Sequence, residues 1–256
     1  MKKRTFYFGM ALILVVAVLL TGCGSKQPAA AKTIVMGTNA EFPPFEFEAD
    51  EGKGLVGQFD GVDVAIAKQI AEDMGVTLQI ENMAFDSLIM ALESGKIDFI
   101  AAAMTVNAER EESCDFTEKY YKAVQLMLVK ADNTEIKSFA DLSGKVAGVQ
   151  QGTTGDFICS DVEDIETVRY VRALDAVLDL KSGKIDAVVV DSMPATMFFN
   201  ENKNELKLLE DKEAFEDEEY AIAIKKGNSE LLAQINKTIL KMKDSGKIDE
   251  LVNQYS

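Results

Sequence analysis

The 256-residue sequence contains no histidine, no tryptophan and only three cysteines. Without histidine there are no imidazole general bases, no histidine metal sites and no triads that need an imidazole. Basic residues are also scarce, because 27 Lys and Arg stand against 43 Asp and Glu, a formal net charge of −16. A surface this acidic repels phosphate backbones, so the composition excludes nucleic acid as a partner. The hydrophobic share of 47% is that of a globular chain, long enough for one large or two small domains.

Residues 1–22 have the pattern of a lipoprotein signal peptide. Basic residues at 2–4 precede an apolar run at 6–20, which is too short to span a bilayer comfortably. The run ends in LTGC at residues 20–23, which resembles a bacterial lipoprotein box with Cys23 as the lipidated residue, a candidate for palmitate. Residues 23–32 are then the lipidated cysteine and a flexible tether. We expect an exported protein held at the extracytoplasmic face of the cell membrane by lipid only; a short membrane anchor with an incidental cysteine is the alternative.

Two segments of the chain share one plan: LIMALESGKIDFIAAAMT at 88–105 and AVLDLKSGKIDAVVVDSM at 176–193. Each combines a helical apolar pattern, the sequence SGKID and an apolar strand. Glycine suits the left-handed position that ends a helix, with lysine beside the carbonyl end. The two copies predict two similar α/β lobes. A third SGKID, at 245–249, has no strand after it and indicates only a helix end.

The remaining pattern predicts strands that alternate with helices, which favours parallel, doubly wound sheets. Strands are expected at residues 32–38, 77–83, 97–104, 145–150, 166–171, 185–191 and 219–226. Helices are expected from Asp63, which would cap the first of them, at 86–94, from about 154, at 173–182, after 191, and at 229–245 and 247–255.

The predicted lobes are discontinuous along the chain. Lobe 1 comprises residues 33–121 plus 219–256, lobe 2 comprises residues 122–218, and two crossings, near residues 121–122 and 217–218, form a hinge. Cys114 and Cys159 fall in different lobes, and a disulfide between them would lock the lobes together. We therefore expect two buried free thiols.

Polar residues follow several of the predicted strands, where ligands of such sheets bind. Four stretches converge there: GTNAEFPPFEF at 37–47, MAFDSLI at 83–89, the end of the strand that leads to Arg110, and GVQQGTTGDF at 148–157. The last opens a helix whose backbone N–H groups attract anions. Asp191 closes the set. Two alternatives remain: Arg110 pairs with a neighbouring glutamate at 109, 111 or 112, and Asp191 is only a helix N-cap.

Taken together, these motifs resemble a polar amino-acid-binding protein of the ABC-transporter solute-binding family, bacterial extracellular solute-binding family 3. The resemblance runs from about residue 33 to the C-terminus and includes FDSLI, the SGKID strand ending in MTVNAER, GVQQGTT and DAVVVD. It implies the type II periplasmic-binding-protein (Venus flytrap) fold, with two doubly wound α/β lobes. It also implies a monomer without cofactor that delivers an amino acid to a membrane permease. The chain has no GxxxxGK[ST] loop, so separate subunits would supply the ATPase.

The resemblance also implies which residues bind the ligand. Arg110 would grip the α-carboxylate, helped by Thr105 and Thr154, and Asp191 would accept the α-ammonium. The full implied set is Asn39, Glu41, Phe42, Phe85, Ala102, Ala103, Thr105, Arg110, Gln150, Thr153, Thr154 and Asp191.

The side chain of the ligand is expected to lie between Phe42 and Phe85, which suits a guanidinium, ammonium or amide group. Binders of basic amino acids in this family often carry an acid where this sequence has Asn39, so Glu41 or Glu46 would have to replace it. A solvated loop acid is the alternative reading of both glutamates. Arginine or another basic amino acid is the preferred ligand, followed by glutamine or cystine.

Two other functions stay open on the sequence. One is a dehydratase-like enzyme built on the same fold, in which Asp191, Glu41 or Lys119 does acid–base work. The other is a signalling module that works through a partner.

Overall fold

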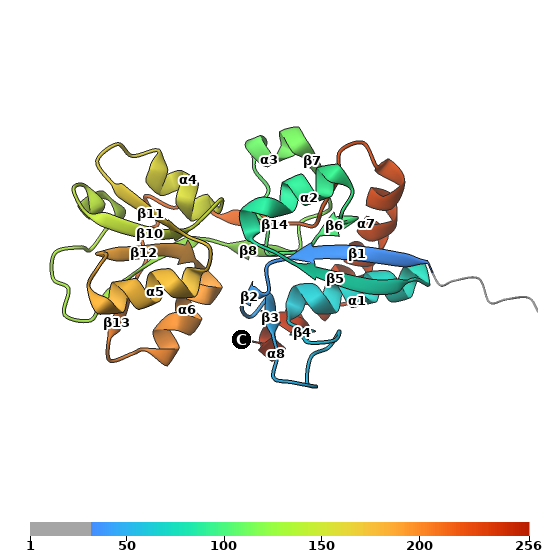
Figure 1. Ribbon diagram of the computed structural model, residues 1–256, viewed down its shortest axis with the longest axis horizontal. Helices are drawn as coiled ribbons and strands as arrows, with labels where there is room; N and C mark the ends of the chain where they lie inside the picture. Colours follow the sequence, from blue (N-terminus) through green and yellow to red (C-terminus); the bar gives the residue numbers. More distant parts are fainter. Residues whose placement is uncertain (1–31, 256) are drawn as a thin grey trace, which may run out of the picture. The chain divides into compact units, whose positions relative to one another are not determined.

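The computed structural model describes residues 32–255. The predicted signal peptide, the predicted lipidation site Cys23 and the predicted tether before residue 32 lie outside them. Two five-stranded sheets form the centres of two lobes (Figure 1). The sheet of lobe 1 has the order β5 (Thr77–Asn82), β1 (Thr33–Thr38), β6 (Phe99–Ile100), β15 (Ala223–Lys225) and β7 (Cys114–Phe116). The sheet of lobe 2 has the order β11 (Glu166–Tyr170), β10 (Val146–Gln150), β12 (Ala187–Asp191), β9 (Gln125–Lys130) and β13 (Leu206–Leu209).

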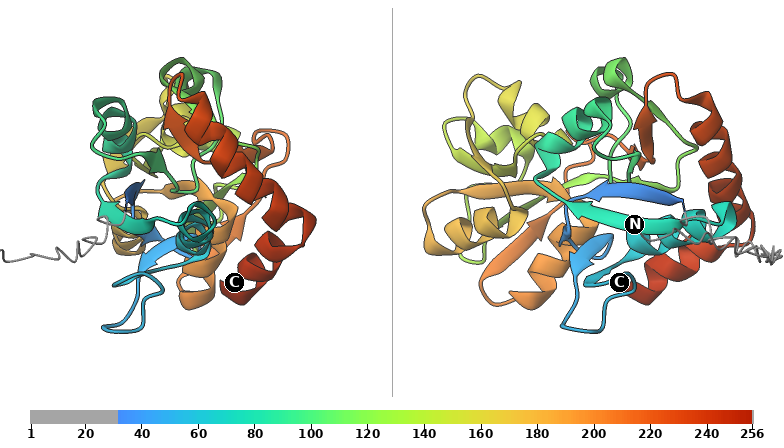
Figure 2. Two further views of the ribbon diagram at one scale, coloured as in Figure 1. Left: turned by 90° about the vertical axis from the view of Figure 1, so that its right-hand side faces the viewer. Right: turned by 45° about the vertical axis from the view of Figure 1, so that its right-hand side comes forward.

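Helices flank both sheets. Those of lobe 1 are α1 (Val62–Met74), the 3₁₀ turn η1 (Phe85–Ser87), α2 (Leu88–Ser94), α3 (Ala108–Ser113), α7 (Ser229–Asp244) and α8 (Lys247–Tyr255). Those of lobe 2 are the 3₁₀ turn η2 (Phe139–Leu142), α4 (Thr154–Ser160), α5 (Ala173–Ser182) and α6 (Ser192–Glu201). The last two helices of the chain pack against α1, and Figure 2 shows them on the outer side of lobe 1. Within residues 32–255, no helix has both the length and the apolarity that a bilayer crossing requires.

The predicted helix ends at SGKID are confirmed. Gly95 ends α2 and Gly183 ends α5, with φ of 76° and 77°, and Gly246, with φ of 71°, separates α7 from α8. A residue with a Cβ adopts this left-handed conformation only at a cost, so the glycine defines the boundary locally.

The two predicted α/β lobes are confirmed, but their sheets are mixed, whereas the alternation of strands and helices favoured parallel ones. In lobe 2, β9 runs antiparallel to β12 and to β13, and in lobe 1 β15 runs antiparallel to β6 and to β7. Parallel neighbours need a long crossover, usually a helix. The element directly before β9 is the strand β8 (Tyr121–Ala123), and the element directly before β15 is the strand β14 (Glu218–Tyr220), so no helix leads into either strand. Strands β8 and β14 pair with each other as a two-stranded ribbon.

That ribbon lies between the two five-stranded sheets (Figure 1). Its strands are antiparallel, and Tyr121 faces Tyr220. The ribbon also explains why the single strand predicted at 219–226 is divided into β14 and β15. The two predicted crossings near residues 121–122 and 217–218 fall at this ribbon.

Strand β6 is much shorter than the predicted strand at 97–104. Its ladder covers only Phe99–Ile100, and the buried chain then passes through a bend at residues 102–103 to an isolated bridge between Thr105 and Tyr220. Ala103 interrupts the strand geometry, because its φ is +45°, the only positive φ of a non-glycine residue among those described. Both cysteines are free and buried, as predicted: Cys114 begins β7 and Cys159 lies in α4.

Candidate functional site

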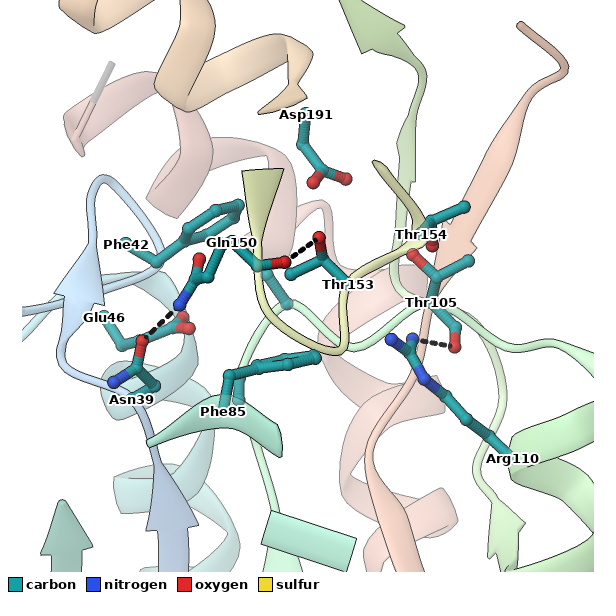
Figure 3. A pocket seen from close by; sticks show the side chains of 12 residues that line it. Asn39, Phe42, Glu46, Phe85, Thr105, Arg110, Gln150, Thr153, Thr154 and Asp191 are labelled. Atoms are coloured by element: carbon teal, nitrogen blue, oxygen red, sulfur yellow. Dashed lines mark hydrogen bonds between the residues drawn. The ribbon is translucent and has the colours of Figure 1, made fainter. Parts of the chain in front are cut away.

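A narrow cavity lies where the carboxyl ends of β1, β6, β10 and β12 meet (Figure 3). Eleven of the twelve residues that the resemblance implied line it, and Glu46 lines it in place of Glu41. The lining residues are Asn39, Phe42, Glu46, Phe85, Ala102, Ala103, Thr105, Arg110, Gln150, Thr153, Thr154 and Asp191.

Arg110 is a buried cation without a carboxylate partner. It lies in α3, where Asn107 caps the helix by accepting a hydrogen bond from the Arg110 amide at 2.8 Å. The guanidinium, 4% exposed, donates to the main-chain carbonyls of Thr105 at 2.7 Å and Gly152 at 2.9 Å, and lies 5.3 Å from the centre of the Phe85 ring. No carboxylate of the described residues lies within 4.0 Å of it, so the alternative of an ion pair with a neighbouring glutamate is not adopted. Burial lowers its pKa, opposed by the charges of Asp191 and Glu218.

Asp191 ends β12 and occupies the N-cap position of α6, yet its side chain makes no capping hydrogen bond. It accepts instead from the hydroxyl of Tyr220 at 2.7 Å. Burial, and then the negative charge of Glu218, raises the pKa of Asp191 to about 7. The carboxyl group lines the cavity and is not used as a helix cap, so it is available to accept hydrogen bonds from a ligand cation.

Glu218 organises the ribbon behind these two anchors and was not recognised in the sequence. It accepts from the hydroxyl of Thr105 at 2.5 Å and from Nε2 of Gln125 at 2.8 Å. The bond to Glu218 holds the Thr105 hydroxyl in place, and Thr105 lines the cavity. No sequence signal distinguishes Glu218, because it stands among other acids in the segment EDEE at 216–219.

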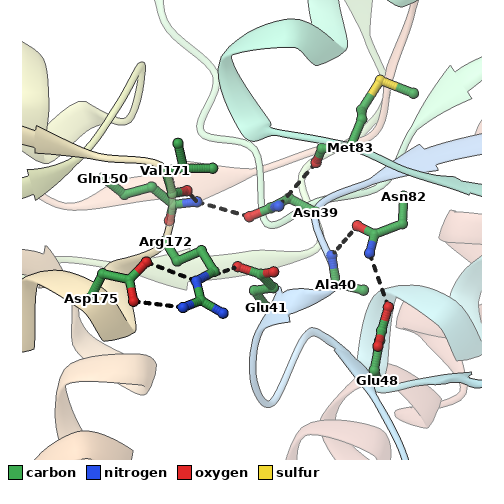
Figure 4. Close-up of polar contacts among 10 residues, drawn as sticks. All are labelled: Asn39, Ala40, Glu41, Glu48, Asn82, Met83, Gln150, Val171, Arg172 and Asp175. Carbon is green, nitrogen blue, oxygen red and sulfur yellow. Dashed lines mark hydrogen bonds and ion pairs between the residues drawn. The ribbon is translucent and has the colours of Figure 1, made fainter. Parts of the chain in front are cut away.

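Hydrogen bonds connect the two lobes around the cavity. Asn39, after β1, accepts from Nε2 of Gln150, at the end of β10, at 2.8 Å, and donates to the carbonyl of Met83 at 2.9 Å (Figures 3 and 4). The bond from Arg110 to the Gly152 carbonyl is a second connection. The lobes are thus in contact through side chains that also line the cavity.

Thr153 and Thr154 bring the start of α4 to the cavity wall. Thr153 is the N-cap residue and donates its hydroxyl to the carbonyl of Gln150 at 2.8 Å. The hydroxyl oxygen of Thr154 is buried and has no hydrogen-bond partner among the described residues. A buried hydroxyl normally has a partner, so this one is available to a bound molecule.

Glu41, which the resemblance implied as a ligand-binding residue, does not line the cavity. Its carboxylate lies 3.7 Å from Arg172, which in turn binds Asp175 at 2.6 Å (Figure 4). Burial raises the pKa of Glu41, and the charge of Arg172 opposes that shift.

Glu46, by contrast, is fully buried in β3 (Glu46–Glu48), the middle strand of a small sheet with β2 (Glu41–Phe42) and β4 (Phe59–Asp60). Neither of its carboxylate oxygens accepts a hydrogen bond from a described residue. The alternative of a solvated loop acid is therefore wrong for Glu46. Burial first, and the neighbouring charge of Asp63 second, raises the pKa of Glu46 well above its usual range.

Asp63 does not cap its helix, so that prediction is wrong as well. The N-cap of α1 is Gly61, and the amides of Val62 and Asp63 bond to the carbonyls of Pro44 and Phe45 at 3.1 and 2.8 Å. The proline loop thus satisfies the helix start. The Asp63 carboxylate is free to turn inward, and it accepts from the Ala103 amide at 2.7 Å and the Tyr120 hydroxyl at 2.9 Å.

Comparison with known proteins places these features in context. The family described as "Bacterial extracellular solute-binding proteins, family 3" matches residues 34–256. The arginine-binding extracellular protein ArtP of Bacillus subtilis is 32% identical over 95% of this chain and 96% of its own. The ABC transporter glutamine-binding protein GlnH of the same organism is 34% identical over 100% and 97%. The crystallised ancestral arginine-binding protein bound to arginine is 39% identical, with a TM-score of 0.80 over 87% of this chain and 97% of its own.

Proposed function

This chain belongs to family 3 of the bacterial extracellular solute-binding proteins, and we propose that it captures a polar L-amino acid, arginine or another basic one, for an ABC importer. The single observation that carries the proposal is the charge of the cavity wall. Arg110 is a buried cation with no carboxylate within 4.0 Å among the described residues, and Asp191 and Glu46 are two buried acids that line the same cavity. A free amino acid supplies the missing counter-charges.

The α-carboxylate of the ligand binds Arg110, whose guanidinium presents several donors to an anion. The unpartnered hydroxyl of Thr154 adds a donor from the other lobe. The α-ammonium binds Asp191 near Thr105. Charge-assisted hydrogen bonds of this kind contribute roughly 1.5–3 kcal/mol each.

A basic side chain accounts for the third charged group. Asn39 is a neutral amide, so it cannot serve as a counter-charge, and its oxygen already accepts from Gln150. Both oxygens of Glu46 lack a donor among the described residues. Phe42 and Phe85 line the cavity beside Glu46 and provide faces for a guanidinium (Figure 3). The likeness to ArtP and to the ancestral arginine-binding protein supports arginine. The likeness to GlnH keeps glutamine as the second candidate, with cystine or another polar amino acid behind it.

The ligand contacts both lobes, so it favours the closed arrangement by its differential affinity for the closed and open forms. Asn39–Gln150, Arg110–Gly152 and Gln151–Asp86 are among the hydrogen bonds that join the lobes in this arrangement. The closed monomer then docks on a membrane permease that separate ATPase subunits drive. The acids in the cavity serve as ligand anchors in this scheme, so we propose a receptor rather than an enzyme.

We also propose that the chain is exported, that Cys23 is lipidated and that the lipid is its membrane attachment. Metabolic labelling with radioactive palmitate tests this. The native protein should incorporate the label and fractionate with membranes, and the Cys23→Ser variant should do neither.

Isothermal titration calorimetry with a panel of amino acids tests the ligand proposal. The full chain is purified in detergent, unfolded and refolded to remove carried-over ligand. Arginine or lysine should bind, and Arg110→Ala should abolish binding. Arg172→Ala is the matched control, because Arg172 is half exposed outside the cavity and should leave affinity unchanged. Binding of glutamine or cystine alone would refute the basic ligand. Absence of binding to every amino acid by folded protein would refute the proposed function.

A further inference from the structure

Glu46, in the wall of the cavity, and Asp63, beside it, are two buried carboxyl groups. The Asp63 amide donates to the carbonyl of Phe45, the residue before Glu46, at 2.8 Å. Both side chains are 0% exposed, and Glu46 lines the cavity. Three of their four oxygens have no N–H or O–H donor among the described residues: Oε1 and Oε2 of Glu46 and Oδ1 of Asp63. Two ionised carboxylates in this position would repel each other without compensation, which is costly in a buried site.

One proton on the pair removes this difficulty. Oδ2 of Asp63 already accepts from the Ala103 amide at 2.7 Å and the Tyr120 hydroxyl at 2.9 Å, so Asp63 keeps its charge more easily than Glu46. A protonated Glu46 has an O–H to donate, and Oδ1 of Asp63 is a neighbouring acceptor without a donor of its own among the described residues. Burial, and then the charge of Asp63, raises the pKa of Glu46 well above its usual range. Burial raises the pKa of Asp63 less, to about 6.

Among residues 32–255, no cation lies beside the pair to neutralise it. The charged and titratable groups that face Glu46 from the packed elements are Asp63 on α1, Tyr120 before β8 and Asp191 on β12. Arg110 lines the same cavity from α3, but it is not among the groups that shift the pKa of Glu46. A positive charge at Glu46 must therefore come from outside the described chain.

We propose that Glu46 and Asp63 share one proton in the ligand-free cavity, and that a ligand with a cationic side chain displaces this proton on binding. The displacement half rests on the proposed function. The O–H bond of Glu46 breaks, the proton passes to solvent, and an N–H of the ligand side chain donates to the carboxylate that remains. One positive charge replaces another, so the net charge of the buried pair with its partner is unchanged.

The consequence is a difference between ligands that share the same backbone. A neutral amide side chain has no charge to exchange for the proton, so glutamine binds with Glu46 still protonated. Asp191 also has a raised pKa and meets the α-ammonium of either ligand. Any proton that Asp191 loses is therefore common to arginine and glutamine, and the difference between the two ligands reports the Glu46–Asp63 pair.

Calorimetry of the full chain in two buffers of different ionisation enthalpy counts the protons exchanged. Arginine should release about one proton more than glutamine, and its affinity should rise about tenfold more per pH unit below the pKa of Glu46. In Glu46→Gln the extra proton and the extra pH dependence should disappear. Glu48→Gln is the matched control, because Glu48 is exposed on the same strand, and it should behave as the native protein.

A ligand-free measurement keeps the two proposals separable. Near neutral pH, the infrared spectrum should contain the carbonyl band of a protonated carboxylic acid that Glu46→Gln loses and Glu48→Gln keeps. If that band is absent, or if arginine binds without the extra proton, the shared proton is refuted while the receptor function stands. If the band is present and no amino acid binds, the receptor function and the displacement fail together.

Discussion

Replacing Asp63 tests how strongly the interior depends on one carboxylate. Asp63 accepts hydrogen bonds from the Ala103 amide and the Tyr120 hydroxyl, and all three residues are buried. In Asp63→Ala both donors lose their acceptor. Each buried donor left unpaired costs about 1–3 kcal/mol, so the free energy of unfolding should fall by about 2–6 kcal/mol. Ala103 gains the most freedom, because its φ of +45° loses the bond that holds it.

Asp63→Asn should cost far less than Asp63→Ala, because the amide oxygen still accepts from both donors. The two variants should also differ from the native protein in their pH dependence. Burial raises the pKa of Asp63 from 3.8 to about 6. Between these values the folded state binds more protons than the unfolded state, so the native protein loses stability as the pH rises through about 6. The loss through this group is about 3 kcal/mol, and asparagine cannot titrate and so removes it.

Urea unfolding of the ligand-free full chain, followed by circular dichroism at several pH values between about 4 and 7, measures both effects. Asp50→Asn is the control, because Asp50 is exposed in a loop and forms a surface pair with Lys53. Equal losses in Asp63→Ala and Asp63→Asn would refute the role of the two hydrogen bonds. A native stability that follows the asparagine variant across this pH range would refute the raised pKa.

Three further predictions concern other parts of the molecule. In Gly152→Ala the new Cβ lies 3.0 Å from Cβ of Asp86 in the other lobe. The strain of a φ of +76° is common to the open and closed forms, whereas this contact arises only on closure. An overpacking cost of about 1–3 kcal/mol should therefore weaken ligand binding about 5- to 150-fold by calorimetry, and unchanged affinity would contradict the close approach. Burial raises the pKa of Cys114 to about 11 and that of Cys159 to about 12. A thiol reagent at neutral pH should therefore label neither cysteine until urea unfolds the chain. Fast labelling of either cysteine in the folded protein would contradict their burial. Arg172→Ala removes only exposed ion pairs, so the thermal unfolding midpoint should barely move, and a large drop would show that the Arg172 contacts matter more than their exposure suggests.

Features that depend on local chemistry were predictable from the sequence. The glycines of SGKID end helices because only the left-handed conformation fits there, and the apolar periodicity of 173–182 reproduces the bounds of α5. Most of the cavity lining was implied by the family resemblance of the motifs. It also agrees with the general rule that ligands of α/β sheets bind beyond the carboxyl ends of the strands.

Features that depend on the path of the chain were not predictable. The antiparallel strands β9 and β15 come directly after the ribbon strands β8 and β14, and the local sequence pattern does not predict that these two short strands pair. The same holds for hydrogen bonds between distant residues. Asp63 is a plausible helix cap in its own segment, and only the proline loop, which satisfies the start of α1, and Ala103, forty residues away, turn it inward.

The two glutamates of the loop after β1 show most clearly which features the local sequence determines and which the tertiary structure determines. Glu41 and Glu46 both lie in EFPPFEF, and their local sequences offer no reason why only Glu46 lines the cavity. The sequence by itself determined that acids, phenylalanines and prolines stand together after the first strand. Only the tertiary structure decided that Glu46 enters the cavity beside Asp63, while Glu41 faces Arg172 outside it. The physical reason is that the environment of a carboxylate is set by the elements that pack around it, and those come from distant parts of the chain.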